Sequence, residues 1–190
     1  MTVTGESDET LMARYGRGDA AAFELLYRRH EMRVWRYLER NVRNRAIADE
    51  LMQEVWFAVA RDATRYEPSA RFTTWLFTIA HNRMIDSIRA NRAHASLDEL
   101  GYDAEAVVRQ LTADPNAGPL EEAVARDQAR ALNNAVEKLP GEQREAFLLQ
   151  VEGDLSVEEI ASITDSSFET TKSRLRYART KLRELLQECV

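Results

Sequence analysis

The sequence has one cysteine, few helix-breaking residues and no long apolar run. Because Cys189 is that single cysteine, no disulfide can form within the chain, and a reducing, cytoplasmic setting is expected. Only seven glycines and four prolines occur among 190 residues, which favours an all-α protein. No run approaches the roughly 20 apolar residues that span a bilayer, and the first ten residues lack the features of a signal peptide. We therefore expect a soluble, intracellular, helical protein.

The formal net charge of −6 is spread unevenly along the chain. Residues 61–92 and residues 166–190 each contain six basic and three acidic groups, whereas residues 93–125 contain one basic and seven acidic groups. Two basic stretches are thus separated by an acidic one. Each basic stretch is either ordinary solubilising surface or a surface that faces a polyanion.

Breaker residues divide the chain into two helical blocks. Residues 94–120 contain two of the four prolines and no sustained apolar periodicity, so we predict a flexible acidic linker there, with a short helix at 103–111 left open. The predicted domains on either side of the linker are residues 8–93 and 121–187. The predicted helices are 8–16, 19–40, 45–62 and 73–91 in the first domain, and 121–137, 141–151, 156–163 and 167–187 in the second.

The C-terminal block has the start signals of a helix-turn-helix. Ser156 and Glu159 have the spacing of a capping box, and Ser166 and Glu169 repeat it. Only residues 164–165 remain to make the turn between the two predicted helices. Helices joined so tightly must cross steeply, which is the geometry of this motif.

The second helix of the motif has an apolar stripe and a basic stripe. The apolar stripe, predicted to face the core, consists of Leu175, Ala178, Leu182 and Leu185. The basic stripe, about a quarter turn away, consists of Lys172, Arg176, Arg179 and Arg183. A recognition helix needs this layout, because its first residues reach base edges and its later cations hold phosphates. The alternative is a basic surface helix with paired charges, but its nearby acids are too few to pair that stripe, so we predict DNA contact.

The basic stretch at 61–92 also contains aromatic residues. On a helix, one stripe consists of Trp75, Thr78, Asn82, Asp86 and Arg89, and the opposite face consists of Leu76, Phe77, Ala80 and Met84. The first stripe offers unstacked bases an aromatic ring, hydrogen-bonding groups and a cation, and each stacked base gains about 1–3 kcal/mol. Aromatic residues at helical spacing are more often core. We expect Phe77 in the core, and the sequence leaves Trp75 open between the two environments.

A third surface lies within 46–62. The predicted core stripe is Leu51, Met52, Val55 and Val59, and the opposite side gathers Asp49, Glu50, Gln53, Glu54 and Phe57. An exposed aromatic among acids indicates a docking site for a basic partner protein. A solvated acidic face is the competing interpretation, and this stretch alone leaves both open.

Together these surfaces resemble the sigma-70 family of bacterial transcription initiation factors, and most closely its small extracytoplasmic-function (ECF) group. The motifs that carry the resemblance are GDAAAFELLYRRH (18–30), ADELMQEVW (48–56), RFTTWLFTIAHNRMID (71–86), LPGEQREAFLL (139–149) and LSVEEIA with TKSRLRYAR (155–179). Their order and spacing cover nearly all of the chain outside the linker. The resemblance implies that 8–93 recognises and opens the −10 promoter element, and that 121–187 reads the −35 duplex.

The resemblance also implies roles for single residues. Those that dock on the clamp helices of the largest polymerase subunit are Asp49, Glu50, Gln53 and Glu54. Those that capture unpaired −10 bases lie in the loop at 64–72 and on the helix after it: Arg65, Tyr66, Ser69, Phe72, Trp75, Asn82, Asp86 and Arg89. Those that contact the −35 duplex are Ser167, Thr170, Lys172, Ser173, Arg176, Tyr177 and Arg179. Residues 167–171 and Tyr177 depart from the usual family pattern, so the resemblance implies the docking mode rather than the base sequence that is read.

The resemblance thus implies a non-catalytic specificity subunit of RNA polymerase that binds promoter DNA. It also makes an anti-sigma factor an expected partner, since members of the family often answer to one. No cofactor is expected, since no nucleotide-binding motif is present and the three histidines lack metal-ligand spacing. One rival is a conventional helix-turn-helix regulator that acts without being a polymerase subunit. The other is an enzyme, but the acids are not accompanied by a His-Glu pair, a Gly-rich loop or a nucleophile elbow.

Overall fold

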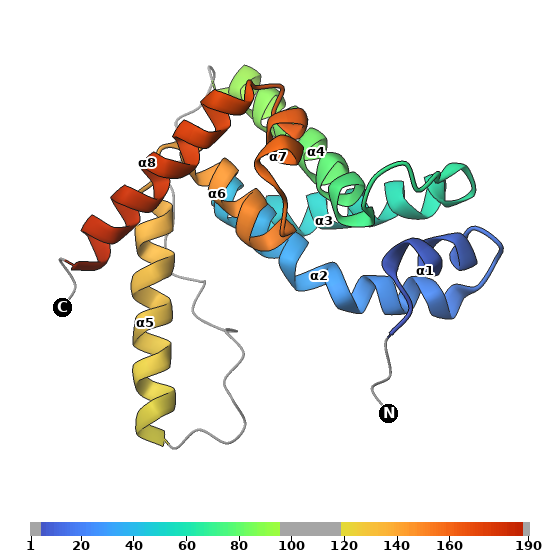
Figure 1. Cartoon of the computed structure of the whole chain (residues 1–190), viewed down its shortest axis with the longest axis horizontal. Helices are drawn as coiled ribbons and strands as arrows, with labels where there is room; N and C mark the ends of the chain where they lie inside the picture. Colours follow the sequence, from blue (N-terminus) through green and yellow to red (C-terminus); the bar gives the residue numbers. More distant parts are fainter. Residues whose placement is uncertain (1–4, 96–118, 188–190) are drawn as a thin grey trace.

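The computed structural model describes residues 5–95 and 119–187, and every element in these two ranges is helical, which confirms the all-α prediction. The N-terminal helices are α1 (Asp8–Tyr15), α2 (Ala20–Val42), α3 (Arg45–Asp62), the 3₁₀ turn η1 (Ala63–Arg65) and α4 (Phe72–Ala95). The C-terminal helices are α5 (Pro119–Glu137), α6 (Gly141–Gly153), α7 (Val157–Ile163) and α8 (Phe168–Gln187) (Figure 1). None of the helices within these ranges has a stretch long and apolar enough to cross a membrane.

The helix boundaries follow the predicted ones closely. Helix α3 has the predicted limits, and α4 extends beyond its predicted range of 73–91 at both ends. The turn η1 was not predicted, because three residues are too few to show a periodic pattern. The open helix at 103–111, and the predicted linker apart from its ends, lie outside the described residues.

Asp19 shows how a local signal starts a helix. Its Oδ1 accepts hydrogen bonds from the backbone N–H groups of Ala21 and Ala22, at 3.1 and 3.4 Å, so Asp19 is the N-cap of α2. The other carboxylate oxygen, Oδ2, lies 2.6 Å from Nη2 of Arg14, at the end of α1. One side chain therefore satisfies the start of α2 and ties it to α1.

Replacing Asp19 tests this cap. Asp19→Ala should lower the free energy of unfolding by about 1 kcal/mol, because two backbone donors at the start of α2 lose their acceptor. Asp19→Asn keeps a capping oxygen and should restore most of that loss. Urea denaturation measures both variants, and an equal loss in both would assign the effect to the ion pair with Arg14 instead.

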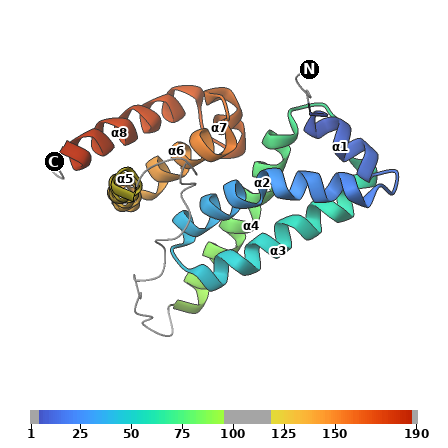
Figure 2. The same cartoon turned by 90° about the horizontal axis from the view of Figure 1, so that it is seen from below.

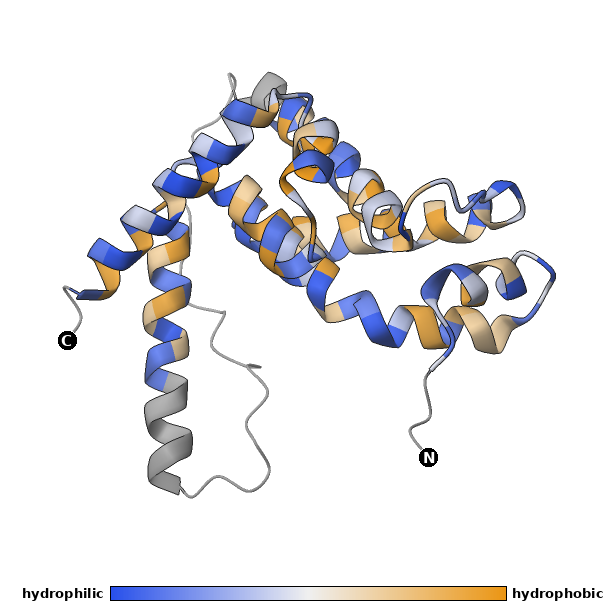
Figure 3. Cartoon of the chain, in the orientation of Figure 1, coloured by the Kyte–Doolittle hydropathy of each residue, from blue (hydrophilic) through white to orange (hydrophobic). Residues whose placement is uncertain are grey.

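The N-terminal helices pack around α2. Helix α2 contacts α1, α3 and α4, and α3 also packs on α4. Hydrophobic residues recur along each helix, separated by hydrophilic ones (Figure 3). The side chains that this packing buries completely include Leu26, Val34, Leu38, Val55 and Phe77. Phe77 is therefore a core residue, as predicted.

The two predicted domains pack against each other. Helix α6 lies along α2 and also contacts α4, and α7 contacts α4 (Figures 1 and 2). Gly153, at the end of α6, is buried in this region: a Cβ atom there would lie 2.8 Å from Cγ of Leu155 and 3.5 Å from Cδ2 of Phe77. The buried residues of both halves form one continuous hydrophobic core.

A buried carboxylate joins the two halves. Glu152 on α6 is only 4% exposed, and its oxygens accept hydrogen bonds from Nε and Nη2 of Arg36 at 2.8–3.0 Å. Nη1 of Arg40 lies 3.3 Å from the same carboxylate. Burial lowers the pKa of Arg40, and the charge of Glu152 opposes that shift. Because both arginines belong to α2, this cluster holds α6 on the N-terminal helices.

Candidate nucleic-acid interface

Helices α7 and α8 form the predicted helix-turn-helix. Oγ of Ser156 accepts the N–H of Glu159 at 3.2 Å, and Oε2 of Glu159 accepts the N–H of Ser156 at 2.8 Å, so the predicted capping box is present. In the turn, Asp165 has a left-handed backbone with φ of 46°. An aspartate tolerates this conformation better than most residues.

The cap of α8 differs from the prediction by one residue. Ser167, not Ser166, is the N-cap, since its Oγ accepts the N–H of Thr170 at 3.1 Å. The hydroxyl of Ser166 instead lies 2.8 Å from Oγ1 of the fully buried Thr171 and 2.9 Å from Oγ1 of Thr164. Ser166 thus stabilises the turn, and Ser167 starts the helix.

Helix α8 turns its apolar stripe inward and its basic stripe outward. Leu175, Ala178 and Leu182 are buried and Leu185 is half-buried. Of the predicted −35 contacts, Ser173 is half-exposed, and the exposed ones are Ser167, Thr170, Lys172, Arg176, Tyr177 and Arg179. The structure therefore leaves the whole predicted reading face accessible to a duplex.

The cations at the start of this face have little electrostatic compensation. Among the described residues, neither Lys172 nor Arg176 forms an ion pair with an acid. The ammonium of Lys172 lies 5.8 Å from the ring centre of Phe168, and the guanidinium of Arg176 lies 5.0 Å from that of Tyr177. On this face, the unpaired cations are suited to contact DNA phosphates, and the exposed aromatic rings are suited to contact apolar groups on the base edges.

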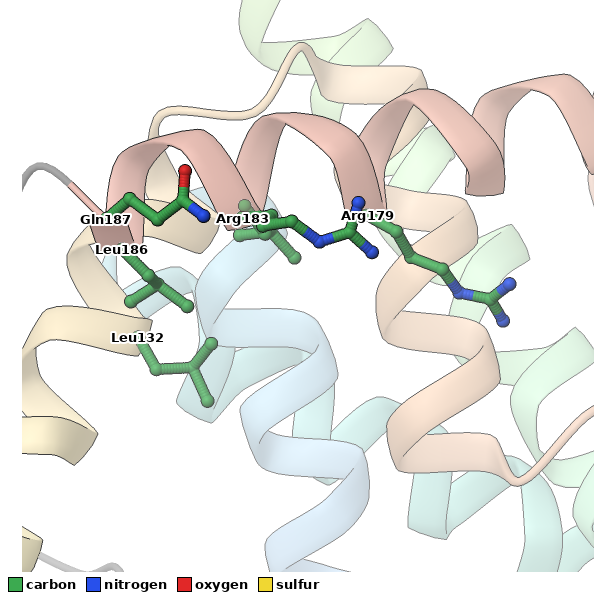
Figure 4. Close-up of a pocket in the computed structure, with 6 residues that line it drawn as sticks. Leu132, Arg179, Arg183, Leu186 and Gln187 are labelled. Carbon is green, nitrogen blue, oxygen red and sulfur yellow. The ribbon is translucent and has the colours of Figure 1, made fainter.

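Further along α8, the basic stripe borders a groove of about 700 Å³ between α5 and α8 (Figure 4). The lining residues are Leu132, Arg179, Leu182, Arg183, Leu186 and Gln187. Nη2 of Arg179 donates to Oε1 of Gln150 on α6 at 2.7 Å. Arg179 therefore lies where the reading face meets this groove.

The loop at 64–72 joins η1 to α4 and contains the first predicted −10 contacts. Arg65 and Ser69 are exposed, whereas Tyr66 is half-buried. The Tyr66 ring lies edge-on to Trp75, with ring centres 5.0 Å apart. Trp75 is half-buried and packs against the core, so one part of its ring is covered and the other is open.

Phe72 lies in the core of this structure, whereas the sequence predicts that it contacts DNA. Its side chain is completely buried, with ring centres 5.4 Å from His30 and 5.9 Å from Trp75. Phe72 begins α4 and points into the space between α4 and α2. An aromatic in that position adds to the core, and a base cannot reach it.

On α4 the remaining predicted −10 contacts are accessible. Asn82, Asp86 and Arg89 are exposed on one side, while the opposite face is buried at Leu76, Phe77, Ala80 and Met84. This confirms the predicted division of α4 into a core face and a polar stripe. The stripe begins beside the half-covered ring of Trp75.

The C-terminal domain covers part of this N-terminal surface. Arg71, the last residue before α4, donates from Nη1 to the carbonyl oxygen of Asp154 at 2.9 Å, and its Nη2 lies 3.2 Å from Oδ2 of Asp154. Nη1 of Arg71 is also 3.8 Å from Oε2 of Glu159, and the hydroxyl of Thr74 donates to Oε1 of Glu159. Burial raises the pKa of Glu159, but hydrogen bonds from Thr74 and Ser156 outweigh it and leave the pKa lowered. Two acids of the C-terminal half, Asp154 and Glu159, thus contact Arg71 of the predicted base-capture loop.

The acidic face of α3 is exposed as well. Asp49, Glu50, Gln53 and Glu54 all reach solvent, whereas the predicted core stripe of Leu51, Met52, Val55 and Val59 is buried. Phe57 is 71% exposed at the end of this face. Beside it lies a shallow groove of about 350 Å³, lined by Phe23, Tyr27, Met52, Gln53, Trp56 and Phe57. An exposed apolar groove beside a row of acids favours the interpretation of this face as a docking site for a protein over that of a solvated acidic face.

Two of these acids also contact the protein itself. Oδ1 of Asp49 accepts a hydrogen bond from Nε1 of Trp35 at 2.8 Å, and Glu54 lies 4.0 Å from Arg83. Asp49 therefore orients α3 against α2 in addition to its predicted role. No local pattern predicts this contact, because Trp35 belongs to another helix.

Comparison with known proteins decides what kind of chain carries these surfaces. The family model for sigma-70 region 2 matches residues 26–94, and the one for sigma-70 region 4 matches residues 129–182. The RNA polymerase sigma factor CarQ of Myxococcus xanthus is 36% identical over 180 residues, which cover 93% of this chain and 96% of the relative. The chain belongs to the sigma-70 family.

Within this family the chain falls in the ECF group. The ECF RNA polymerase sigma factor SigK of Mycolicibacterium vanbaalenii is 30% identical over 186 residues, which cover 97% of this chain and 91% of the relative. As an ECF sigma factor, the protein is a transcription initiation factor that directs RNA polymerase to promoters. The rival interpretation as a stand-alone helix-turn-helix regulator is not favoured.

Solved structures show that this ECF sigma factor shares its fold with known proteins. The structure of CnrH in complex with the cytosolic domain of CnrY matches with a TM-score of 0.63 and 23% identity over 96% of this chain and 99% of the other. The sigma factor RpoE in complex with the anti-sigma factor NepR, from Bartonella quintana, matches with a TM-score of 0.67 and 23% identity over 87% and 96% of the two chains. At this identity the likeness concerns the fold.

Proposed function

We propose that this ECF sigma factor divides promoter recognition between its two domains. Helix α8 enters the major groove of the −35 element, and the loop at 64–72 with the polar stripe of α4 holds unpaired −10 bases. The observation that carries the proposal is the pair of separate, exposed faces on α8 and α4, each within a matched sigma-70 region. The protein performs no catalytic step: binding energy opens the duplex, and the polymerase supplies the phosphodiester chemistry in the cytoplasm.

The acidic face of α3 is the proposed docking surface for the clamp helices of the polymerase. Its exposed acids and the open ring of Phe57 offer a basic helical partner both charge and apolar contact. Asp49, Glu50, Gln53 and Glu54 keep the roles predicted from the sequence. Phe57 and the groove beside it extend the same surface.

The packed arrangement must open before both elements are bound. Arg71, in the base-capture loop, and Thr74, in the first turn of α4, bind residues of the C-terminal half, so the exposed loop is tied to that half while α7 lies on α4. The linker predicted from the sequence at 94–120 would, as a flexible chain, span about 30 Å on average, close to one turn of DNA at about 34 Å. Separated domains on such a tether reach both elements.

We further propose that an anti-sigma factor holds the protein in its packed form. Support comes from the fold it shares with RpoE of Bartonella quintana, whose structure contains the anti-sigma factor NepR. A partner that binds only the packed form would preserve the contacts between Arg71 and the acids of the C-terminal half, such as Asp154. The base-capture loop would then stay tied to the C-terminal half until the partner leaves.

Run-off transcription tests the proposed function. The purified protein is mixed with core RNA polymerase, and transcripts are measured on promoter fragments from the genome that encodes it. The expected result is a stable complex and discrete transcripts that core polymerase alone does not make. A protein that binds a palindromic duplex tightly by itself and yields no transcript would support the stand-alone regulator instead.

Removing cations from α8 tests the −35 contact. Lys172→Ala and Arg176→Ala should each weaken binding of holoenzyme to a −35 duplex and flatten the salt dependence of log K by up to about 0.9 per lost phosphate contact. Lys181→Ala is a matched control, because Lys181 is paired with Glu184 further along α8. An unchanged salt slope in both test variants would mean that the basic stripe does not touch the DNA backbone.

A further inference from the structure

A carboxylate of helix α1 binds the end of the predicted base-capture loop. Oε1 of Glu9 accepts a hydrogen bond from the backbone N–H of Phe72 at 2.8 Å, across 63 positions of sequence. Phe72 is the first residue of α4, and the first N–H groups of a helix have no partner within the helix. Glu9 therefore fixes the point at which the loop ends and α4 begins.

The charge of Glu9 suits this place. The hydrogen bond from Phe72 is the largest cause that lowers the pKa of Glu9, so the carboxylate is ionised at neutral pH. A negative charge at the N-terminus of a helix is favourable, because the unpaired N–H groups carry partial positive charge. Glu9 thus serves α4 as an N-cap supplied by a different helix.

The neighbouring residue, Asp8, ties α1 to α2. Oδ2 of Asp8 lies 2.7 Å from Nε2 of the buried His30, and Oδ1 of Asp8 accepts a hydrogen bond from Arg29 at 2.7 Å. Burial raises the pKa of Asp8, but these two partners outweigh it and leave the pKa lowered. Since His30 and Arg29 both belong to α2, Glu9 is held by a frame that does not depend on the loop.

The other end of the loop is anchored in the same region. The Tyr66 ring lies edge-on to Trp75 and to Phe72, with ring centres 5.0 and 6.2 Å apart. Burial raises the pKa of Tyr66 to about 12, and the charges of Glu9 and Asp8 add to that effect. Between these anchors, all of residues 67–71 are exposed. The loop is therefore a short exposed segment with two fixed ends.

We infer that Glu9 is a positioning residue for the capture of −10 bases. It holds the end of the loop at α4 in the shape that receives an unpaired base, and it acts through Phe72 rather than by touching DNA. A loop held in its binding shape loses less conformational entropy when a base binds. This inference rests on the proposed role of the loop in −10 recognition.

The test compares two DNA probes with holoenzyme formed from full-length variants. One probe is a fork with a single-stranded −10 element, and the other is a duplex that contains the −35 element alone. Glu9→Ala should weaken fork binding about tenfold while −35 duplex binding and polymerase binding stay unchanged. Glu9→Gln keeps an acceptor for the N–H of Phe72 and should restore most of the affinity. Glu24→Ala is the matched control, because it removes an exposed acid that pairs with Arg28 on α2.

Each outcome decides between distinct conclusions. If wild-type holoenzyme does not bind the fork more tightly than the duplex, the proposed −10 role of the loop is wrong. If wild type prefers the fork and Glu9→Ala does so equally, the positioning role is wrong while the proposed function stands. A loss of thermal stability with equal weakening on both probes would show that Glu9 supports the fold in general, which also overturns the inference.

Discussion

The affinity for core RNA polymerase should fall about a hundredfold when Glu50 and Glu54 are both changed to lysine. Both side chains are exposed on α3 and lie near the open ring of Phe57. A charge reversal replaces attraction to a basic partner helix with repulsion. For a charge pair that is buried and hydrogen-bonded in an interface, truncating one member already costs about 2–5 kcal/mol. Fluorescence anisotropy of labelled protein titrated with core polymerase measures the change.

The choice of residues follows from the contacts on α3. Asp49 accepts a hydrogen bond from Trp35, so changing it would disturb the packing of α3 on α2 as well as the docking surface. A matched control carries Glu24→Lys and Glu158→Lys, two exposed acids on α2 and α7 that change the net charge equally. If the α3 variant keeps its helicity and binds polymerase with wild-type affinity, this face is a solvated surface and not a docking site.

Glu152→Ala should separate the two domains. The substitution leaves Arg36 and Arg40 facing each other without the buried carboxylate that compensates both. Removing one partner of a buried pair costs about 3–5 kcal/mol, and this pair lies in the interface where α6 packs on α2. Small-angle X-ray scattering should show a larger radius of gyration, while circular dichroism shows unchanged helicity.

A second substitution shows whether the charge or the shape of Glu152 matters. Glu152→Gln keeps the volume and one acceptor but removes the charge, so it should open the domains less than alanine does. Glu142→Ala is the control, because Glu142 is exposed and pairs with Arg174 inside the C-terminal half. A compact scattering profile for Glu152→Ala with intact helicity would mean that the hydrophobic part of the interface holds the halves together without this cluster.

These two experiments address different steps of the proposed mechanism. The α3 variant tests attachment to the polymerase, and the Glu152 variant tests release of the surface that the polymerase must present to DNA. Opening also frees Arg71 from Asp154, since both contacts cross the same interface. We therefore expect Glu152→Ala to bind polymerase at least as well as wild type.

Much of the fold and site could be predicted because the signals are local. Asp19 caps α2 and Ser156 with Glu159 caps α7, since a capping side chain lies within three residues of the N–H it accepts. The inward and outward faces of α8 follow from a period of 3.6 residues, which fixes which side chains share a side. Even so, Ser166 and Ser167 were not separable from spacing, because either hydroxyl can cap a helix that begins one residue later.

The sequence by itself thus determined the helices, their faces and the family, since each depends on neighbours within a few turns or on motif order. Tertiary structure alone decided that Phe72 is buried, that Glu9 caps α4 and that Glu152 joins the two domains. Arg36 and Glu152 are 116 positions apart, and nothing in the pattern of either helix specifies the other. Such contacts form only when packing buries side chains that are distant in the sequence next to each other. A buried charge without a partner has a high free-energy cost, so a buried charge requires a partner.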